Sequence, residues 1–442
     1  MSEYFPSKDN WDCFRLIEHE RFPIEEGDLC TLLLEGVQDS SSNTSLPYLK
    51  YMGMDYNFHK KEFFLSYYIG SDWIDREKGR SILVTPKIKG IDFQKMFMAC
   101  FYDNSVNDNL DELFHIRTND SLIDVPSNEF QLEPLLIIYY INLVKQIVRK
   151  GLRKDYVIRE ERLKSKIKGK MMFSQYIKHG IAKNRKETVP CRFEEYSIDC
   201  TDNRILKKAL LICKDMIVRN KKVLSTNYTI LNNIMNEVMA AFEHISADIS
   251  VKDLARVRIN KVFKLYKSAI PLAKMIIRKK GYCVTKSNHK GMVSFPPFII
   301  NMPLLFERYV YGLLVEKYGK YNIGFQERVK GGIMDFSKKD EHMVIDTKYI
   351  TTWDKDIIHD NVGQLSRYAR NISNRYKYLE IDDDRFICPC MIIYPSIDGA
   401  DDLKSAPDIL ASEDIHAQYP YIKPIHEYLK FFKLSIKLPV IQ

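Results

Sequence analysis

The 442-residue sequence lacks any hydrophobic run long enough to cross a membrane. Its longest apolar run, residues 134–144, is shorter than the about 20 residues that a transmembrane helix needs. We expect this run to form a buried core helix. The first residues also lack the positive and then apolar pattern of a secretory signal. These absences predict a soluble, cytoplasmic protein with no membrane partner.

Motifs of several enzyme classes are missing as well. There is no Gly-x-x-x-x-Gly-Lys-Ser/Thr loop, because Gly169-Lys170 and Gly319-Lys320 continue with Met and Tyr. The chain should therefore not hydrolyse nucleotides itself, and any nucleotide-driven motor must be a separate polypeptide. A Gly-x-Ser-x-Gly elbow and a His-Glu-x-x-His motif are also absent.

The nine cysteines include no Cys-x-x-Cys pair. Cys388 and Cys390 form the one close pair, inside an apolar stretch that predicts a strand. Two thiols are too few for a zinc site, which takes about four ligands. We expect buried free thiols, as in a reducing compartment.

Positive charge is scarce in the first part of the chain and abundant later. Residues 1–140 contain 13 Lys/Arg and 24 Asp/Glu, whereas residues 145–186 contain 15 Lys/Arg and 3 Asp/Glu. Nucleic acid would be repelled by the first segment and attracted by the second. The basic segment favours contact with phosphate or with an acidic partner, and the alternative is a solvated basic face.

The pattern along the chain predicts a multidomain α+β fold in three parts. Residues 1–125 form a β-rich acidic module, residues 126–290 a mostly helical basic middle domain, and residues 291–442 a C-terminal α/β domain. Apolar residues at three- and four-residue spacing from Ile205 to Ile217 predict one buried helix face in the middle domain. Candidate strands of the first module are residues 31–35, 63–69 and 81–85.

Two short apolar runs, each carrying an acid, are the most informative stretch of the chain. Residues 332–336 contain Asp335, and residues 343–349 contain Asp346 and Lys348. Alternate side chains of a strand share a face, so Asp346 and Lys348 should point the same way. If the two runs pair as a hairpin, Asp335 lies beside Asp346. Two carboxylates and an ammonium group on one sheet face are suited to metal-dependent phosphodiester hydrolysis.

The flanking segments favour this interpretation over two ordinary surface strands. A helix with Pro303 near its start should carry Glu307, a third carboxylate. A later helix should place Gln364 and Tyr368 on one face, because they are four residues apart. Further strands are expected at residues 321–327 and 386–394.

A second acid-x-Lys triplet, Asp402-Leu403-Lys404, follows a polar stretch and should be a solvated loop. Two histidines near the candidate site, His342 and His359, should lie at the surface.

The order of one helix, three strands, one helix and one strand resembles the core of the PD-(D/E)xK nuclease superfamily with its Gln-x-x-x-Tyr element. More narrowly, the chain resembles McrC, the nuclease subunit of McrBC-type modification-dependent restriction systems. Residues 203–210, Asn-Arg-Ile-Leu-Lys-Lys-Ala-Leu, are similar to a block of that family, and so are Gly151–Val157 with Lys168-Gly169-Lys170. The resemblance covers roughly residues 135–395.

The resemblance implies a Mg²⁺-dependent DNA endonuclease in which Mn²⁺ can substitute. Asp335 and Asp346, with Glu307 and the Thr347 carbonyl, would bind the metal. Lys348 would position the attacking water, and Gln364 and Tyr368 would support it. The partners implied are double-stranded DNA, methylated in some targets, and a McrB-like AAA+ hexamer that hydrolyses GTP or ATP. Residues 1–125 would dock to that ring and stimulate hydrolysis.

One departure from the family pattern keeps other functions open. The family usually has Arg-Pro before the first catalytic Asp, and here Ile333-Met334 stand there. One alternative is an autonomous nuclease of the same fold that acts on branched or replicating DNA. The other is a non-catalytic adaptor that binds DNA and regulates an NTPase.

Overall fold

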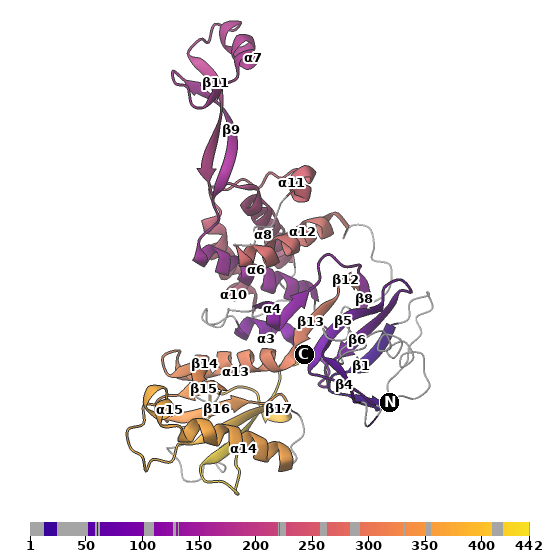
Figure 1. The fold of residues 1–442 in the computed structure, drawn as a ribbon, viewed down its shortest axis with the longest axis vertical. Coiled ribbons are helices and arrows are strands. Elements are labelled where there is room, and N and C mark those ends of the chain that lie inside the picture. The colour runs from indigo at the N-terminus through magenta and orange to yellow at the C-terminus, as the bar shows by residue number, and fades with distance from the viewer. Residues whose placement is uncertain are drawn as a thin grey trace. The chain divides into compact units, whose positions relative to one another are not determined.

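The computed structural model divides into two compact units, Met1–Leu135 with His289–Gln442, and Leu136–Asn288 (Figure 1). The first and third predicted domains therefore contribute to one unit, and their separation at residues 125 and 291 stays a prediction. The residues that the structure describes are 13–23, 52–57, 60, 62–100, 110–126, 130, 132–219, 221, 227–256, 263–282, 292–329, 332–350, 355–408 and 419–441.

Strands from distant parts of the chain form the first sheet of the first unit. β13 follows the helical middle in sequence, yet it pairs antiparallel with β5 and β7. Residues from the predicted third domain thus complete a sheet that the predicted first domain begins. Across the sheet the order is β1 (Cys13–Ile17), β6 (Arg80–Thr85), β5 (Tyr68–Asp75), β13 (Phe298–Asn301) and β7 (Phe114–Ile116).

Smaller elements complete the N-terminal part of this unit. The predicted strand at 81–85 is confirmed within β6. The single strand predicted at 63–69 is wrong, because Ser66 and Tyr67 separate two strands that belong to different sheets. The strand predicted at 31–35 lies outside the described residues. The smaller elements are β2 (Arg21–Pro23), β3 (Met54–Asn57), β4 (Glu62–Leu65), α3 (Phe93–Cys100), α4 (Leu110–Leu113), β8 (Ile123–Pro126) and β12 (Met292–Phe295).

A six-stranded sheet forms the C-terminal part of the same unit. β14 to β16 form an antiparallel meander, and β16, β17 and β19 run parallel to one another. Its order is β14 (Ile323–Val329), β15 (Gly332–Lys338), β16 (Met343–Thr347), β17 (Cys390–Ala400), β19 (Phe431–Ile436) and β18 (Ile422–Pro424).

Helices cover both faces of this sheet. Figure 1 shows α13 (Met302–Tyr318) on one face and α14 (Lys355–Arg370), followed by α15 (Ile372–Lys377), on the other. The first face packs Phe336 against Tyr311 of α13, and the second packs Val344 with Leu365 of α14. The predicted order of helix, three strands, helix and strand is therefore present.

Local sequence signals fix the ends of α13. The Asn301 side chain accepts a hydrogen bond from the Leu304 amide, which caps the helix start. Pro303 lies in the first turn, where its missing N–H costs little. Gly312 lets the helix approach α3, because a Cβ there would lie 2.6 Å from the Ala99 carbonyl oxygen.

The predicted strand at 386–394 begins later than expected. β17 starts at Cys390, and the preceding Pro389 has no backbone N–H with which to pair. The Cys388 thiol donates to the His342 carbonyl at 3.0 Å, and the Cys388 and Cys390 side chains lie in the same buried cluster. The prediction of buried free thiols is confirmed for six cysteines whose side chains the structure describes, which are Cys100, Cys191, Cys200, Cys213, Cys388 and Cys390.

The second unit is largely helical, as predicted. The apolar run at 134–144 lies in α6 and is buried apart from partly exposed Pro134. One face of α8, from Ile205 to Ile217, is buried as its spacing indicates. Its helices are α6 (Leu132–Lys150), α8 (Thr201–Arg219), α10 (Asn227–Ala241), α11 (Val251–Arg256) and α12 (Lys264–Tyr282).

Among the described residues, none of the helices combines the length and the apolar character that a membrane span requires.

A long hairpin in this unit was not expected from the sequence. β9 (Asp155–Lys164) and β11 (Thr188–Ser197) pair antiparallel along ten residues. Between them lie β10 (Lys170–Met171), α7 (Phe173–Tyr176) and the π-helical turn Ile177–Ile181. A small apolar cluster of Val189, Cys191 and Phe193 holds this end together.

Candidate active site

The meander of β15 and β16 brings Asp335 and Asp346 together. Phe336 pairs with Ile345 in the ladder, so the next position along both strands sets Asp335 against Asp346. Asp346 is 1% exposed. Asp335 Oδ2 accepts two hydrogen bonds from Thr347, one from the amide and one from the hydroxyl, each 2.9 Å long.

A chain of polar contacts links Asp346 to α14. The Lys348 ammonium lies 2.8 Å from Asp346 Oδ2. It also donates to Gln364 Oε1 at 3.3 Å. The Gln364 amide in turn donates to the Tyr368 hydroxyl at 3.2 Å. The structure therefore places Lys348, Gln364 and Tyr368 in one connected group with the two aspartates.

Glu307 approaches the same group from α13. Its Oε1 accepts a hydrogen bond of 2.9 Å from the Gln326 side chain. Burial raises the pKa of Glu307 to about 8, and the charges of Asp335 and Asp346 add to the rise. The third predicted carboxylate thus belongs electrostatically to the aspartate pair.

The two aspartates hold more negative charge than their surroundings neutralise. Burial raises the pKa of Asp346 to about 7, and the neighbouring Asp335 charge adds to the effect. Burial also raises the pKa of Asp335, against the hydrogen bonds from Thr347. Burial acts to lower the pKa of Lys348, but the charges of Asp346 and Asp335 outweigh it and raise this pKa. The ammonium group therefore stays protonated while the carboxylates compete for further positive charge.

This donor set fits a hard divalent cation. Asp346 Oδ1 is buried and has no hydrogen-bond partner among the described residues. Within that part of the chain, no three His, Cys, Asp or Glu side chains already stand as a metal-binding cluster. Mg²⁺ does not require one, since it commonly keeps several waters and binds through one or two carboxylates. Asp335 and Asp346 can supply those carboxylates.

A model of the protein family described as "McrBC 5-methylcytosine restriction system component" matches residues 65–379. The chain belongs to this family. The resemblance drawn from the sequence motifs is thereby confirmed, and the matched range includes every predicted site residue. No curated protein matches the chain significantly.

Solved structures from the same restriction system are similar to the chain at low identity. A half-complex from a tetradecameric assembly of Thermococcus gammatolerans McrB AAA+ hexamers with bound McrC shares 15% identity, with 97% of this chain and 95% of that chain covered and a TM-score of 0.36. The cryo-EM structure of the Thermococcus gammatolerans McrBC complex shares 16% identity, with 69% and 87% covered and a TM-score of 0.28.

Two residues of the site in this McrBC family member were missed in the sequence. Gln326 contacts Glu307 and has a φ of 47°, which is uncommon for a residue other than glycine. Gly332 has a φ of 148°, and a Cβ there would lie 2.5 Å from the Tyr368 hydroxyl. A glycine at the first position of the strand that carries Asp335 was the available signal for Gly332, whereas nothing in the sequence marked Gln326.

The histidines near the site do not join it. The prediction that His342 lies at the surface is wrong, because it is partly buried against Phe386 and its Nδ1 lies 2.6 Å from the Leu379 carbonyl. His359 is exposed as predicted, and it contacts the Tyr428 hydroxyl at 2.5 Å. The exposure predicted for Asp402 and Lys404 is confirmed as well.

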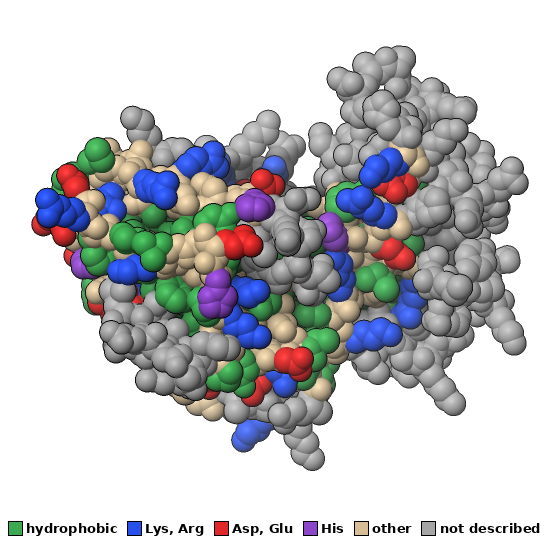
Figure 2. Space-filling model, turned by 90° about the horizontal axis from the view of Figure 1, so that it is seen from below, with side chains coloured by type: hydrophobic (Ala, Val, Ile, Leu, Met, Phe, Trp, Pro, Cys, Tyr) green, Lys and Arg blue, Asp and Glu red, His purple; other side chains and the backbone are tan. Residues whose placement is uncertain are grey.

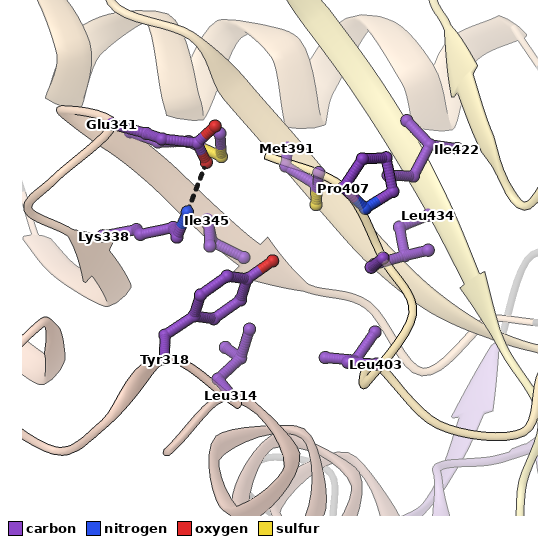
Figure 3. Close-up of a pocket in the computed structure, with 12 residues that line it drawn as sticks. Leu314, Tyr318, Lys338, Glu341, Ile345, Met391, Leu403, Pro407, Ile422 and Leu434 are labelled. Atoms are coloured by element: carbon purple, nitrogen blue, oxygen red, sulfur yellow. Dashed lines mark hydrogen bonds and ion pairs between the residues drawn. The ribbon is translucent and has the colours of Figure 1, made fainter. Parts of the chain in front are cut away.

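A small cavity on the α13 side of the sheet is separate from these residues (Figure 3). Its volume is about 20 Å³, room for about one water molecule. The buried Lys338 ammonium pairs there with Glu341 at 2.6 Å and lies over the Tyr318 ring. This arrangement explains how a buried lysine is accommodated, and it leaves no space for a substrate.

Proposed function

We propose that the chain is the DNA-cleaving subunit of its McrBC restriction system, acting by Mg²⁺-dependent phosphodiester hydrolysis. The observation that carries the proposal is the connected group of Asp335, Asp346, Lys348, Gln364 and Tyr368 in a chain of this family. Structural packing alone gives no reason to bury two adjacent carboxylates whose pKa values are both raised.

Each residue has a role that follows from its contacts. Asp335 and Asp346, with Glu307 and the Thr347 carbonyl, would hold the cation. A bound Mg²⁺ supplies Lewis-acid polarisation of the phosphate and lowers the pKa of a coordinated water. Lys348 would orient the attacking water and offset the charge that develops on the phosphate.

The α14 residues act on Lys348. Gln364 Oε1 accepts from the ammonium group and restricts where it can lie. Tyr368 is 4% exposed and holds the Gln364 amide through its hydroxyl. Both side chains therefore pre-organise the lysine, which matters because small displacements of a catalytic group lower the rate strongly.

DNA would be bound through phosphates on basic surfaces. The hairpin of the second unit is densely basic, and Lys164, Lys166, Lys168 and Lys170 are all exposed. On the face shown in Figure 2, the described Lys and Arg side chains stand among acidic and apolar ones. The hairpin is therefore the stronger described candidate for phosphate contact or for an acidic partner.

The partner we propose is a McrB-like AAA+ NTPase that translocates on DNA, in keeping with the restriction-system family. Residues 1–125 remain one candidate docking surface. The end of the hairpin is a second, because it exposes large apolar side chains. Phe173 is 66% exposed, Ile177 57% and Ile181 49%. Exposed apolar clusters of this kind commonly mark protein interfaces.

The test is cleavage of methylated and unmethylated plasmid in Mg²⁺, with and without the AAA+ partner and NTP. Cutting that requires partner and NTP supports the proposal, and cutting without them would favour the autonomous nuclease. A double Asp335→Ala, Asp346→Ala variant that still cuts would contradict the site.

A non-catalytic adaptor remains the second candidate, favoured by Ile333-Met334 in place of Arg-Pro. Titration calorimetry with Mg²⁺ and Mn²⁺ separates the two. An enzyme should bind the metal and lose binding in Asp346→Ala. An adaptor should stimulate the NTPase without binding metal at this position.

A further inference from the structure

The turn after β1 buries a glutamate that belongs to no predicted site. Glu18 is 0% exposed, and its Oε1 accepts hydrogen bonds from the Lys87 amide at 3.0 Å and from the Tyr349 hydroxyl at 2.7 Å. Its Oε2 is buried without a hydrogen-bond partner among the described residues. Burying a carboxylate costs free energy. The hydrogen bond between Tyr349 and Glu18, 331 positions apart, partly offsets that cost.

Tyr349 directly follows the active-site lysine. The Lys348 backbone is fixed at this point, because its amide donates to the Ile393 carbonyl and its carbonyl accepts from Ile350, each at 2.9 Å. The Tyr349 side chain is 6% exposed. An anchor on its hydroxyl therefore constrains the segment that carries Lys348.

The Tyr349 ring also contacts the helix that carries Glu307. Its centroid lies 6.0 Å from that of Phe306, the residue preceding Glu307 on α13. On another side it meets Tyr67 edge-on at 5.8 Å. The ring is thus wedged between α13 and the N-terminal strands, with Lys348 at its base.

The segments around Glu18 and Tyr67 are themselves fixed by several contacts. Tyr67 stacks on His19 with a centroid distance of 4.4 Å, and their polar atoms lie 3.3 Å apart. The Tyr67 carbonyl accepts from the Met302 amide at the start of α13. Glu18 therefore presents its carboxylate from a segment tied to the same helix.

We propose that Glu18 and Tyr349 are positioning residues, and that their hydrogen bond sets the place of the Lys348 ammonium beside Asp346. The inference rests on the proposed nuclease function. It gives the N-terminal strands a part in hydrolysis that is separate from any docking to the NTPase.

The deciding variant is Tyr349→Phe, which removes the hydroxyl and keeps the ring against Phe306. With the AAA+ partner, NTP and Mg²⁺, we expect kcat for DNA cleavage to fall about tenfold, since displaced catalytic groups act less well. The KM for DNA should stay within about twofold, because no phosphate contact is removed. Mn²⁺ affinity, measured by calorimetry, should also stay within about twofold, because the carboxylates are intact.

The matched control is Tyr394→Phe, the same deletion on β17 of the same sheet, where the hydroxyl bonds Ser435. Its kcat should be unchanged and its loss of melting temperature similar to that of Tyr349→Phe. Glu18→Gln keeps an acceptor at Oε1 and should recover most of the kcat that Glu18→Ala loses.

The variants distinguish a failure of the positioning role from a failure of the proposed nuclease function. If the wild type cuts, Asp346→Ala is inactive and Tyr349→Phe keeps full kcat, the positioning role is refuted while the nuclease stands. A kcat loss that Glu18→Gln fails to recover, or one that accompanies a much larger loss of melting temperature than in the control, would also refute it. Cleavage by Asp346→Ala would refute the site on which the inference rests.

Discussion

At the scale of single residues, the site combines surplus negative charge with one well-placed ammonium group. Lys348 contacts Asp346 and Gln364 at once, so its position is defined from the strand and from α14. Asp335 is held by Thr347, the residue between Asp346 and Lys348. The acids and the lysine therefore constrain one another, and single substitutions should separate metal binding from catalysis.

Replacing Lys348 by Met should lower DNA cleavage while leaving metal binding in place. Loss of one group that stabilises transition-state charge costs roughly 10²–10³ in rate. Because both aspartates remain, Mn²⁺ should still bind in calorimetry. Asp346→Asn is the comparison, and it should lose both cleavage and Mn²⁺ binding. Equal loss of metal binding in the two variants would contradict a separate role for Lys348.

Glu18 should make stability depend on pH in a defined window. Burial raises its pKa from 4.5 to about 6 in the folded protein. Between these values the folded state binds more protons than the unfolded state, so this group's contribution to stability falls as pH rises. The loss is complete above about pH 6 and amounts to about 2 kcal/mol, at about 1.4 kcal/mol for each pKa unit.

The measurement is the free energy of unfolding of the wild type and of Glu18→Gln between pH 4.5 and 7.5. The variant cannot titrate at this position, so its stability relative to the wild type should improve by about 2 kcal/mol across the window. A constant difference at all pH values would show that Glu18 keeps an ordinary pKa.

At the scale of elements, a glycine decides how closely β15 and α14 approach. Gly332 has a positive φ, and a Cβ added at this position would lie 2.5 Å from the Tyr368 hydroxyl oxygen. Tyr368 in turn holds Gln364. The start of β15 and helix α14 can therefore pack this closely because residue 332 has no side chain.

Gly332→Ala should lower both stability and cleavage. The backbone strain alone costs on the order of 1–3 kcal/mol, and the added methyl group displaces Tyr368. Gly319→Ala is the matched control, because Gly319 has a φ of 82° but nothing lies within 4 Å of a Cβ there. Denaturant unfolding should show a loss for both variants, and only Gly332→Ala should lose cleavage. Equal cleavage by the two variants would exclude the Tyr368 contact as the cause.

The elements around the site could be predicted from local patterns, and their long-range partners could not. Helix α13 followed from Pro303 and helical spacing, and β15 and β16 followed from apolar runs that each carry an acid. The hairpin of β9 and β11 was missed because β9 is rich in charged residues and contains no buried side chain. The insertion of β13 between β5 and β7 leaves no trace in its four residues.

The same limit applies within the site. Asp335, Asp346 and Lys348 could be found because neighbouring strands carry them. Gln326 and the pair of Glu18 and Tyr349 depend on tertiary contacts, the latter across 331 positions. Residue spacing predicts neighbours only within one element or across one turn. Contacts between distant segments can therefore be identified only from the three-dimensional structure.

At the scale of the whole molecule, the candidate catalytic residues and the exposed apolar side chains at the end of the hairpin belong to different units. The aspartates and Lys348 lie in the unit that includes His289–Gln442, and the hairpin lies in Leu136–Asn288. An apolar surface at the end of a basic hairpin is costly to leave in water unless a partner covers it. Catalysis and partner binding should therefore be separable by mutation.

A double Phe173→Ser, Ile177→Ser variant should weaken binding to the AAA+ partner at least about tenfold, because exposed aromatic and apolar anchors commonly dominate interface energy. Stimulation of NTP hydrolysis should fall with it. Mn²⁺ binding and melting temperature should stay as in the wild type, since neither side chain is buried.

Tyr321→Ser, at a tyrosine that is 94% exposed in the other unit, is the control and should keep full partner affinity. Unchanged partner binding by the hairpin variant would exclude this surface and leave residues 1–125 as the docking module. Loss of partner binding with intact metal binding would instead show that the hairpin of the second unit contacts the AAA+ partner, while the metal-binding residues of the first unit act separately from that contact.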